Sequence, residues 1–241
     1  MDKINRILKK HHYAVFMDFE GTQFSHEMIA IGAVVCTLNK DGTIKHYKKP
    51  FKTYVKAKNK IGTYVMNLTG ITQELLDKKG VLFSTAMKEF KKYCGYSFSR
   101  AVFITFGNHD LRILSQSIAY NLDAPKEICS QIQKNYVDFQ PIISEFVRDD
   151  NYNPMSLVHY LEVFNIKESG QAHDPEVDAV NLAYLFDGFV KNKELVLEQY
   201  MKVLQKMNNL PAPVKSVISK LAKGETVTGN DLRNEARKYI K

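Results

Sequence analysis

The stretch VFMDFEGT, residues 15–22, places two carboxylates in an otherwise apolar strand. Because side chains alternate along a β-strand, Asp18 and Glu20 point to the same face of a sheet. Two unpaired carboxylates side by side repel each other, so the pattern favours a divalent cation between them. Oxygen ligands select Mg²⁺ or Mn²⁺ over zinc. The alternative is a pair of surface acids at a strand end, but the apolar residues from Val15 to Phe19 favour a buried strand.

Composition and cysteine usage limit the class of protein. With 44% hydrophobic and 25% charged residues among 241, the chain can bury a sizeable core without a metal or disulfide staple. Cys36, Cys94 and Cys129 form no CxxC spacing, which argues for a reducing compartment and against a thiolate metal site. No apolar run is long enough to span a membrane, and the basic N-terminal residues lack the apolar region of a secretory signal. We therefore expect a soluble, cytoplasmic protein with no membrane partner.

The net charge of +8 is unevenly spread along the chain. Residues 40–60 hold eight lysines against one acid, and residues 191–241 hold eleven basic residues against five acidic ones. Basic segments around a more acidic middle suit a polyanion held over a carboxylate-lined site that has captured cations. The alternative is that the lysines protect a strand edge and solvate a surface helix.

Three antiparallel strands are expected first. Residues 13–19 and 28–37 are apolar runs typical of buried strands, and the turn at 39–43 contains the Asp-Gly pair that tight hairpins favour. Residues 44–55 are expected to form a third strand, placed at the edge of the sheet by its lysines and by Pro50, which cannot donate to a ladder.

Helices then alternate with two further strands, at 101–107 and 136–139. The expected helices are a short one within 67–77 that follows a turn at Thr69–Gly70 and is capped by Thr72, then 85–95 (capped by Ser84), 109–122, one that begins near Pro141, 155–166 and 174–190. This order predicts an α/β fold, with a five-stranded mixed sheet flanked by helices. Residues 1–190 are expected to form this domain, and 191–241 a basic helical C-terminal extension with breaks at 211–213 and 224–230.

Two more motifs carry candidate site residues. Asp110 follows the strand and glycine of FITFGNHD, at the end of a strand, where α/β proteins build sites, although Asp also caps helices. In HDPEVD, residues 173–178, His173 precedes a helix and Asp178 lies inside it. An acid on an apolar helix stripe needs a partner. A histidine before a helix is more often a cap or a surface residue than a catalytic group.

Taken together, DFEGT (18–22), NLTGIT (67–72), GNHD (107–110) and GQAHDPEVDA (170–179) resemble the motifs of the DEDDh branch of the DnaQ-like 3′→5′ exonucleases, with features of the Eri-type members. The resemblance covers roughly residues 12–190 and implies an RNase H-like fold. Two departures are Gly21, where many members carry Thr or Ala, and Phe106, which is often Trp.

The resemblance also implies a reaction and a role for each motif residue. The acids Asp18, Glu20, Asp110 and Asp178 would hold two Mg²⁺ or Mn²⁺ ions that flank the scissile phosphate. Asp18 would bridge both ions, Glu20 and Asp178 would complete the site of the attacking water, and Asp110 would hold the second ion. His173 would be the general base. The products would be nucleoside 5′-monophosphates, released from a free 3′ end of single-stranded nucleic acid, with RNA favoured over DNA.

Contacts to the 3′-terminal nucleotide are expected from residues near these motifs. Gly21 and Thr22 are candidates to contact its sugar and 3′-OH, and Phe24, Leu68 and Ile71 are candidates to sandwich its base. Core packing is an equally good explanation for Leu68 and Ile71.

Two non-enzymatic interpretations stay open at this point. The same fold can serve as a non-catalytic nucleic-acid-binding module or as a scaffold. The complete set of four acids and one histidine argues against both, because degenerate members usually lose one of them. The extension has no recognisable motif, and we expect it to assist in binding substrate or a partner.

Overall fold

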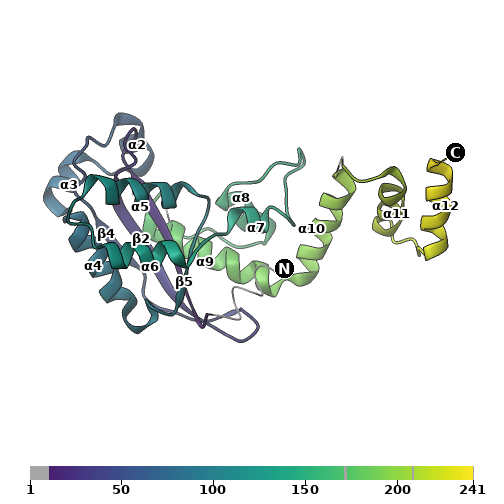
Figure 1. Ribbon diagram of the computed structural model, residues 1–241, viewed down its shortest axis with the longest axis horizontal. Helices are drawn as coiled ribbons and strands as arrows, with labels where there is room; N and C mark the ends of the chain where they lie inside the picture. The colour runs from purple at the N-terminus through teal and green to yellow at the C-terminus, as the bar shows by residue number, and fades with distance from the viewer. Residues whose placement is uncertain (1–10, 171–172, 208, 241) are drawn as a thin grey trace. The chain divides into compact units, whose positions relative to one another are not determined.

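A mixed β-sheet forms the centre of the part of the chain that holds all the candidate site residues (Figure 1). The computed structural model describes residues 11–170, 173–207 and 209–240. The chain divides into two compact units: the first contains the residues up to Ile142 and Ser156–Lys191, and the second contains Ile143–Met155 and Asn192–Lys241.

The sheet has the order β3-β2-β1-β5-β6, and β4 also pairs with β2. Its strands are β1 (Tyr13–Gly21), β2 (Met28–Leu38), β3 (Ile44–Tyr47), β4 (Phe51–Tyr54), β5 (Ala101–Thr105) and β6 (Tyr136–Asp138). Strands β3, β2, β4 and β1 pair antiparallel, whereas β5 pairs parallel with both β1 and β6. The prediction of a sheet that is antiparallel on one side and parallel on the other is therefore confirmed.

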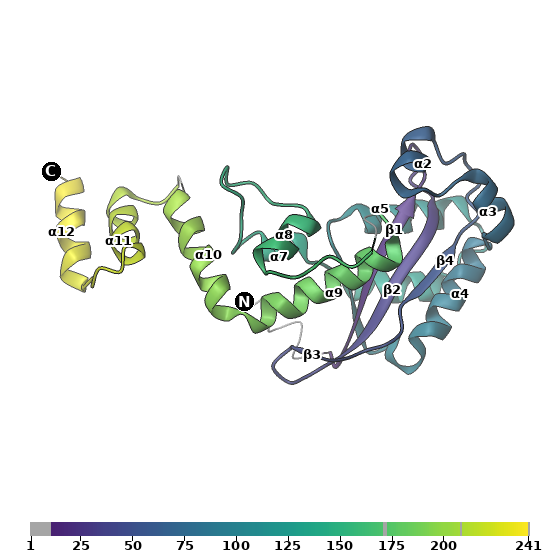
Figure 2. The same ribbon diagram turned by 180° about the vertical axis from the view of Figure 1, so that it is seen from behind.

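Helices cover both faces of this sheet. The first unit contains α2 (Thr63–Thr69), α3 (Gln73–Lys79), α4 (Phe83–Cys94), the 3₁₀ turn η1 (Gly95–Ser97), α5 (His109–Tyr120), α6 (Lys126–Lys134), α8 (Leu157–Val163) and α9 (Pro175–Lys191), and α7 (Gln140–Ile143) ends at its boundary. Helices α4, α5 and α6 lie on one face, and α9 lies on the other (Figures 1 and 2). The alternation along β1 matches these layers, because Val15, Met17 and Phe19 join the core under α4 to α6, whereas the Phe16 ring contacts Phe186 of α9.

The predicted third strand is two strands, so the sheet has six strands where the sequence predicted five. The break falls at Lys48–Pro50. There the Lys48 N–H still donates to the Val35 carbonyl at 2.9 Å, but Pro50 has no N–H to continue the ladder. The Tyr93 hydroxyl fills the gap: it accepts the Val35 N–H at 3.2 Å and lies 2.9 Å from the Lys49 carbonyl oxygen.

One predicted helix start is confirmed and another is wrong. The turn predicted at Thr69–Gly70 separates α2, which was not predicted, from α3, and Gly70 adopts a left-handed conformation there (φ 69°). Thr72 caps α3 as predicted, because its side chain accepts the Leu75 N–H at 3.1 Å. Ser84 is not the cap of α4: this helix begins one residue before it, and the Ser84 hydroxyl donates to the Asp123 carboxylate at 2.5 Å.

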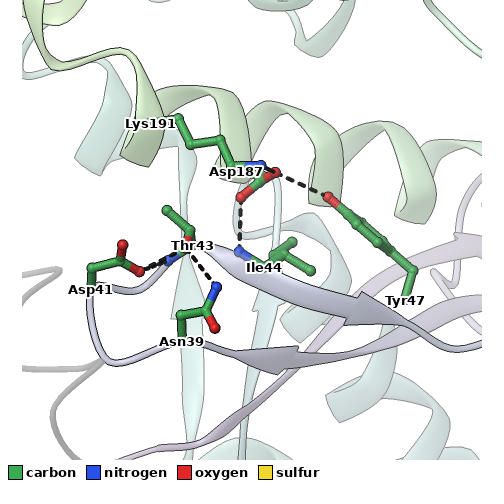
Figure 3. A network of polar contacts seen from close by, with 7 residues as sticks. All are labelled: Asn39, Asp41, Thr43, Ile44, Tyr47, Asp187 and Lys191. Carbon is green, nitrogen blue, oxygen red and sulfur yellow. Dashed lines mark hydrogen bonds and ion pairs between the residues drawn. The ribbon is translucent and has the colours of Figure 1, made fainter.

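Asp187 joins the β2–β3 hairpin to α9 (Figure 3). This buried carboxylate accepts the Ile44 N–H at 2.8 Å and the Tyr47 hydroxyl at 3.3 Å. Its second oxygen also accepts the Lys191 ammonium, one helical turn further on, at 2.5 Å. Burial and the neighbouring Asp187 charge raise the pKa of Tyr47, so this hydroxyl stays a donor. Each partner therefore donates to Asp187, and its buried charge is compensated.

The second unit is helical in its C-terminal part, as expected. It contains α10 (Lys193–Lys206), α11 (Ala212–Ala222) and α12 (Gly229–Tyr239). The Phe146 ring packs on Tyr200 of α10 with centroids 5.1 Å apart, so residues from before α8 belong to the same unit. The predicted boundary near residue 190 stays a prediction. Among the described residues, no helix has the length and apolarity needed to cross a membrane.

We expect Asp187→Ala to lower the free energy of unfolding by about 2–3 kcal/mol, because it leaves the buried Ile44 N–H without its charged acceptor. Urea unfolding followed by circular dichroism measures this loss. Lys191→Ala is the matched control: its ammonium is about half exposed, so we expect a loss under about 1 kcal/mol. Equal losses in the two variants would contradict a role for Asp187 in holding the hairpin.

Candidate active site

Three elements bring the predicted acids together at one end of β1. The first contribution is β1 itself, which carries Asp18 and Glu20 on the face covered by α9. Its pairing with β5 stops at Phe16, so the following backbone groups along that edge are open. Asp110 occupies this edge: its carboxylate accepts the Phe19 N–H at 2.7 Å. A single hydrogen bond thus fixes Asp110 of α5 beside the paired acids of β1.

Asp110 is not the helix cap that its position also allowed. The residue before the first turn of α5 is Asn108, and Asp110 lies inside that turn with only 5% of its surface exposed. A carboxylate near a helix N-terminus is stabilised by the helix dipole. Asp138, at the end of β6, accepts the Gly107 N–H at 2.8 Å and so holds the loop that leads into α5.

The third contribution is the first turn of α9, which approaches β2 where that strand has no side chain. Gly32 pairs directly with Asp18 across the β1–β2 ladder. A Cβ atom on Gly32 would lie 1.8 Å from the carbonyl oxygen of Pro175 and 2.4 Å from the backbone nitrogen of Glu176. The backbone of α9 therefore occupies the place of a side chain at Gly32, and this places Asp178 near the acids of β1.

His173 completes the group from the segment before α9. Its backbone N–H donates to the Asp178 carboxylate at 3.0 Å, and its φ of 63° is unusual for a non-glycine residue. A ligand atom from each of Glu20, His173 and Asp178 lies within 4.8 Å of the other two. The structure thus brings the predicted histidine to the predicted acids.

Burial and mutual repulsion raise the pKa values of all four acids. For Asp18 the pKa rises well above its usual value, mainly through burial and then through Asp110 and Glu20. Burial and then Asp178 raise the pKa of Glu20 to about 8. Burial raises the pKa of Asp110 to about 7, against the opposing hydrogen bond from Phe19. For Asp178, burial raises the pKa to about 6 although His173 opposes the rise.

The donor set fits divalent cations of the Mg²⁺ and Mn²⁺ class. Buried carboxylates need compensating charge, and carboxylate oxygens are the ligands that such hard cations prefer. Lys52 is the basic side chain that lowers the pKa of Glu20, but its ammonium pairs with Asp174 at 2.6 Å. One oxygen of Glu168, a neighbour of Asp178, is buried without any hydrogen-bond partner within the described part of the chain. The site therefore holds more negative charge and acceptor capacity than the described residues satisfy.

Sequence reasoning did not single out Lys52, Asp174, Glu168 or Asp138. Lys52 belongs to the lysines expected on an edge strand. In the sheet it pairs with Gly32 of β2, and Gly32 pairs in turn with Asp18 of β1. Asp174 belongs to the quoted motif HDPEVD, so its position beside a candidate ligand was a usable signal. Nothing local marks Glu168 or Asp138.

The residues predicted to hold the terminal nucleotide differ in exposure. Phe24 is 83% exposed and Leu68 37%, so both side chains are available to a ligand. Ile71 is only 3% exposed and packs with Ile29 and Leu76, which supports core packing rather than base stacking.

Gly21 and Thr22 are both engaged by the protein itself. A Cβ atom on Gly21 would lie 2.9 Å from the Ile113 side chain, so glycine is required here by packing against α5. The Thr22 hydroxyl accepts the Glu27 N–H at 2.9 Å and lies 2.6 Å from the Ser25 hydroxyl. It closes the turn after β1, and the side chain is 1% exposed. Both residues are buried as a whole, so their predicted contacts to a sugar stay a prediction.

A sequence model of the family described as exonuclease (RNase_T) matches residues 15–186. This chain belongs to that exonuclease family. A comparison of its sequence with curated proteins finds no match.

Solved exonucleases share the fold at low sequence identity. The nuclease domain of 3′hExo, described as a DEDDh family member bound to rAMP, superposes with a TM-score of 0.60 at 20% identity, over 76% of this chain and 93% of that one. Cell-death related nuclease 4 (CRN-4) gives 0.59 at 19% identity, over 75% and 64%. E. coli Exonuclease I in complex with a dT13 oligonucleotide gives 0.58 at 17% identity, over 80% and 44%. The predicted exonuclease family is confirmed, and the chain has the fold that these exonucleases share.

We expect Gly32→Ala to displace the first turn of α9 in this exonuclease, because the new methyl group meets backbone atoms that cannot rotate away. The loss in free energy of unfolding should be about 3 kcal/mol or more, and the stabilisation by Mn²⁺ should disappear. Thermal unfolding with Mn²⁺ and with EDTA measures both effects. Gly229→Ala is the matched control, because a methyl group there would have no neighbouring atom within 4 Å among the described residues. Retention of the Mn²⁺ effect in Gly32→Ala would contradict this account of the site.

The raised carboxylate pKa values also predict how metal and pH act together. In EDTA, the folded site binds more protons than the unfolded chain, whose carboxylates titrate near pH 4, so its contribution to stability falls as pH rises toward about 8. A divalent cation bound by these carboxylates, such as Mn²⁺, would replace those protons. The rise in Tm on adding Mn²⁺ should therefore be larger at pH 8 than at pH 6, and Asp18→Asn should lack it. Equal rises at both pH values would contradict a carboxylate site.

Proposed function

We propose that this chain is a 3′→5′ exonuclease that hydrolyses single-stranded nucleic acid by a two-metal-ion mechanism and releases nucleoside 5′-monophosphates. The observation that carries the proposal is the convergence of Asp18, Glu20, Asp110 and Asp178 from three separate elements into one undercompensated anionic group. Membership of the exonuclease family supports it.

The four acids would hold the cations, and Asp18 is the one whose pKa Asp110, Glu20 and Asp178 all raise. When bound, divalent cations would polarise the phosphate, activate the attacking water and stabilise the leaving 3′ oxygen. The bonds that Asp110 and Asp178 accept from backbone N–H groups keep these carboxylates in place before any ligand binds. Such preorganisation is what a site needs to hold reacting groups in one geometry.

His173 is suited to take the proton from the attacking water at a ring nitrogen. The side chain is exposed, and a ring nitrogen lies within 4.8 Å of ligand oxygens of Glu20 and Asp178. A general base has to be within hydrogen-bond reach of the water, directly or through one further water, and this position allows it. The unusual backbone conformation of His173 fits strain kept at a functional position.

The terminal base would lie against the exposed side chains of Phe24 and Leu68, with the sugar near the end of β1 at Gly21 and Thr22. Stacking on apolar side chains tolerates any base, so little sequence preference is expected. RNA is the favoured substrate: one structural neighbour is bound to rAMP and another is described in 3′-end recognition of histone mRNA stem-loop, although E. coli Exonuclease I binds dT13 and dA16. The cytoplasm remains the expected compartment.

The decisive experiment uses RNA and DNA of the same sequence, labelled at either end, with Mn²⁺ or with EDTA. We expect Mn²⁺-dependent shortening from the 3′ end, faster on RNA. We expect Asp18→Asn to lower the rate on the order of 10³-fold or more while binding persists, because removing a metal ligand removes several kcal/mol of transition-state stabilisation.

Glu74→Gln, an exposed acid of α3, is the control and should keep the wild-type rate. If neither RNA nor DNA shortens with any divalent metal while both still bind, the chain is a binding module or scaffold instead. Shortening from the 5′ end would refute the proposed polarity, and wild-type rates in Asp18→Asn would refute the metal site.

A further inference from the structure

A basic groove lies between α4 and α6, outside the candidate active site. The hollow has a volume of about 690 Å³, and its lining includes Lys88, Lys91 and Lys92 from one wall and Lys126 from the other, next to the acidic side chain of Glu127. All four lysines are exposed. Charges that merely solvate a surface helix follow that helix, whereas these converge from two helices on one concave surface. The arrangement concentrates positive potential where an anion can enter.

A second basic hollow, of about 460 Å³, lies beside the loop that precedes α2. Its lining includes Lys58, Asn59 and Lys60. Buried Glu27 fixes the loop, because its carboxylate accepts the backbone N–H groups of Lys58 at 2.8 Å and Asn59 at 3.0 Å. The two lysines are thus displayed on a segment whose backbone is held by a buried acid.

The turn between α5 and α6 connects the two hollows. The Lys58 ammonium donates to the Tyr120 carbonyl at the end of α5. Three residues later, Asp123 accepts the hydroxyl of Ser84 at the start of α4. Leu122, between them, is 97% exposed. The turn between α5 and α6 therefore contacts both the loop that carries Lys58 and Lys60 and helix α4, which lines the groove. The exposed apolar side chain on this turn is that of Leu122.

The second hollow also adjoins the strand that carries the active-site acids. Gln23, three residues after Glu20, donates its N–H to the Ile61 carbonyl at 2.8 Å. Its side-chain oxygen accepts the Tyr64 N–H at the start of α2 at 3.3 Å. The loop that carries Lys58 and Lys60 is therefore tied to the segment that follows β1.

We propose that these residues form a lysine track that binds the phosphodiester backbone of the substrate strand on the 5′ side of the nucleotide being removed. The track consists of Lys58, Lys60, Lys88, Lys91, Lys92 and Lys126. Lysine ammonium groups neutralise phosphates without regard to sequence, and exposed apolar side chains such as Leu122 offer contact to any base. The proposal rests on the proposed function and adds to it a site for the distal part of a single strand.

The test compares substrates of different length. One is a dinucleotide, which can reach only the active site, and the other has about 20 nucleotides, more than the roughly 4–16 that one nucleic-acid-binding fold covers. In Lys92→Gln/Lys126→Gln, one charge is removed from each wall of the groove. We expect kcat/KM on the long substrate to fall on the order of ten-fold at 0.1 M salt, with no change on the dinucleotide.

Lys40→Gln/Lys45→Gln is the matched control. It removes the same charge from exposed side chains around the β2–β3 hairpin and should change the long-substrate rate by less than about twofold, because salt screens exposed charges beyond about 10 Å. Binding of the long strand is measured by fluorescence anisotropy in EDTA at several salt concentrations. The slope of log K against log salt concentration should become shallower by about 1.4 in the groove variant only.

The binding measurement separates the two proposals. If no substrate is hydrolysed but the groove variant alone loses affinity and salt dependence, the exonuclease proposal fails and the track stands. If hydrolysis occurs and the groove variant matches the control, or loses the same factor on both lengths, the track is refuted.

Discussion

The close approach of α9 to Gly32 is the constraint on which the rest of the site depends. A helix normally packs on a sheet through interleaved side chains, but here the backbone of Pro175 and Glu176 lies where a side chain of β2 would be. This contact brings an acid of α9 to the acids of β1. On the opposite face of β1, the core fixes the strand against which α9 packs.

Two carboxylates on α9, buried Asp187 and partly buried Asp178, differ in how the chain satisfies them. Asp187 receives a backbone N–H, a hydroxyl and an ammonium, so the folded chain alone satisfies it. Asp178 receives one backbone N–H and lies among further acids that raise its pKa. A cluster of acids without compensating charge lowers the free energy of unfolding. Proteins keep such a cluster where a bound ligand supplies the missing charge.

The sequence was informative wherever the signal was local. The alternation in VFMDFEGT placed both acids on one face, and the apolar runs predicted the mixed sheet. The failures have tertiary causes. Pro50 broke a strand because it has no N–H, and Tyr93, far along the chain, bonds Val35 and Lys49 beside the break. The role of Ser84 depended on Asp123. Strand register, which no local pattern specifies, pairs Gly32 with Asp18 on one side and with Lys52 on the other.

The divided outer strand also affects how copies of this molecule can meet. An open rim of a sheet can recruit another chain by extending the ladder, and the gain grows with the number of consecutive free N–H and C=O groups. Here the outermost strands are segments of four residues on one side and three on the other, interrupted on the first side by Lys48–Pro50. Strand addition by a second copy would gain few bonds at either rim, which disfavours fibre-like growth even at the high protein concentrations that metal titrations require.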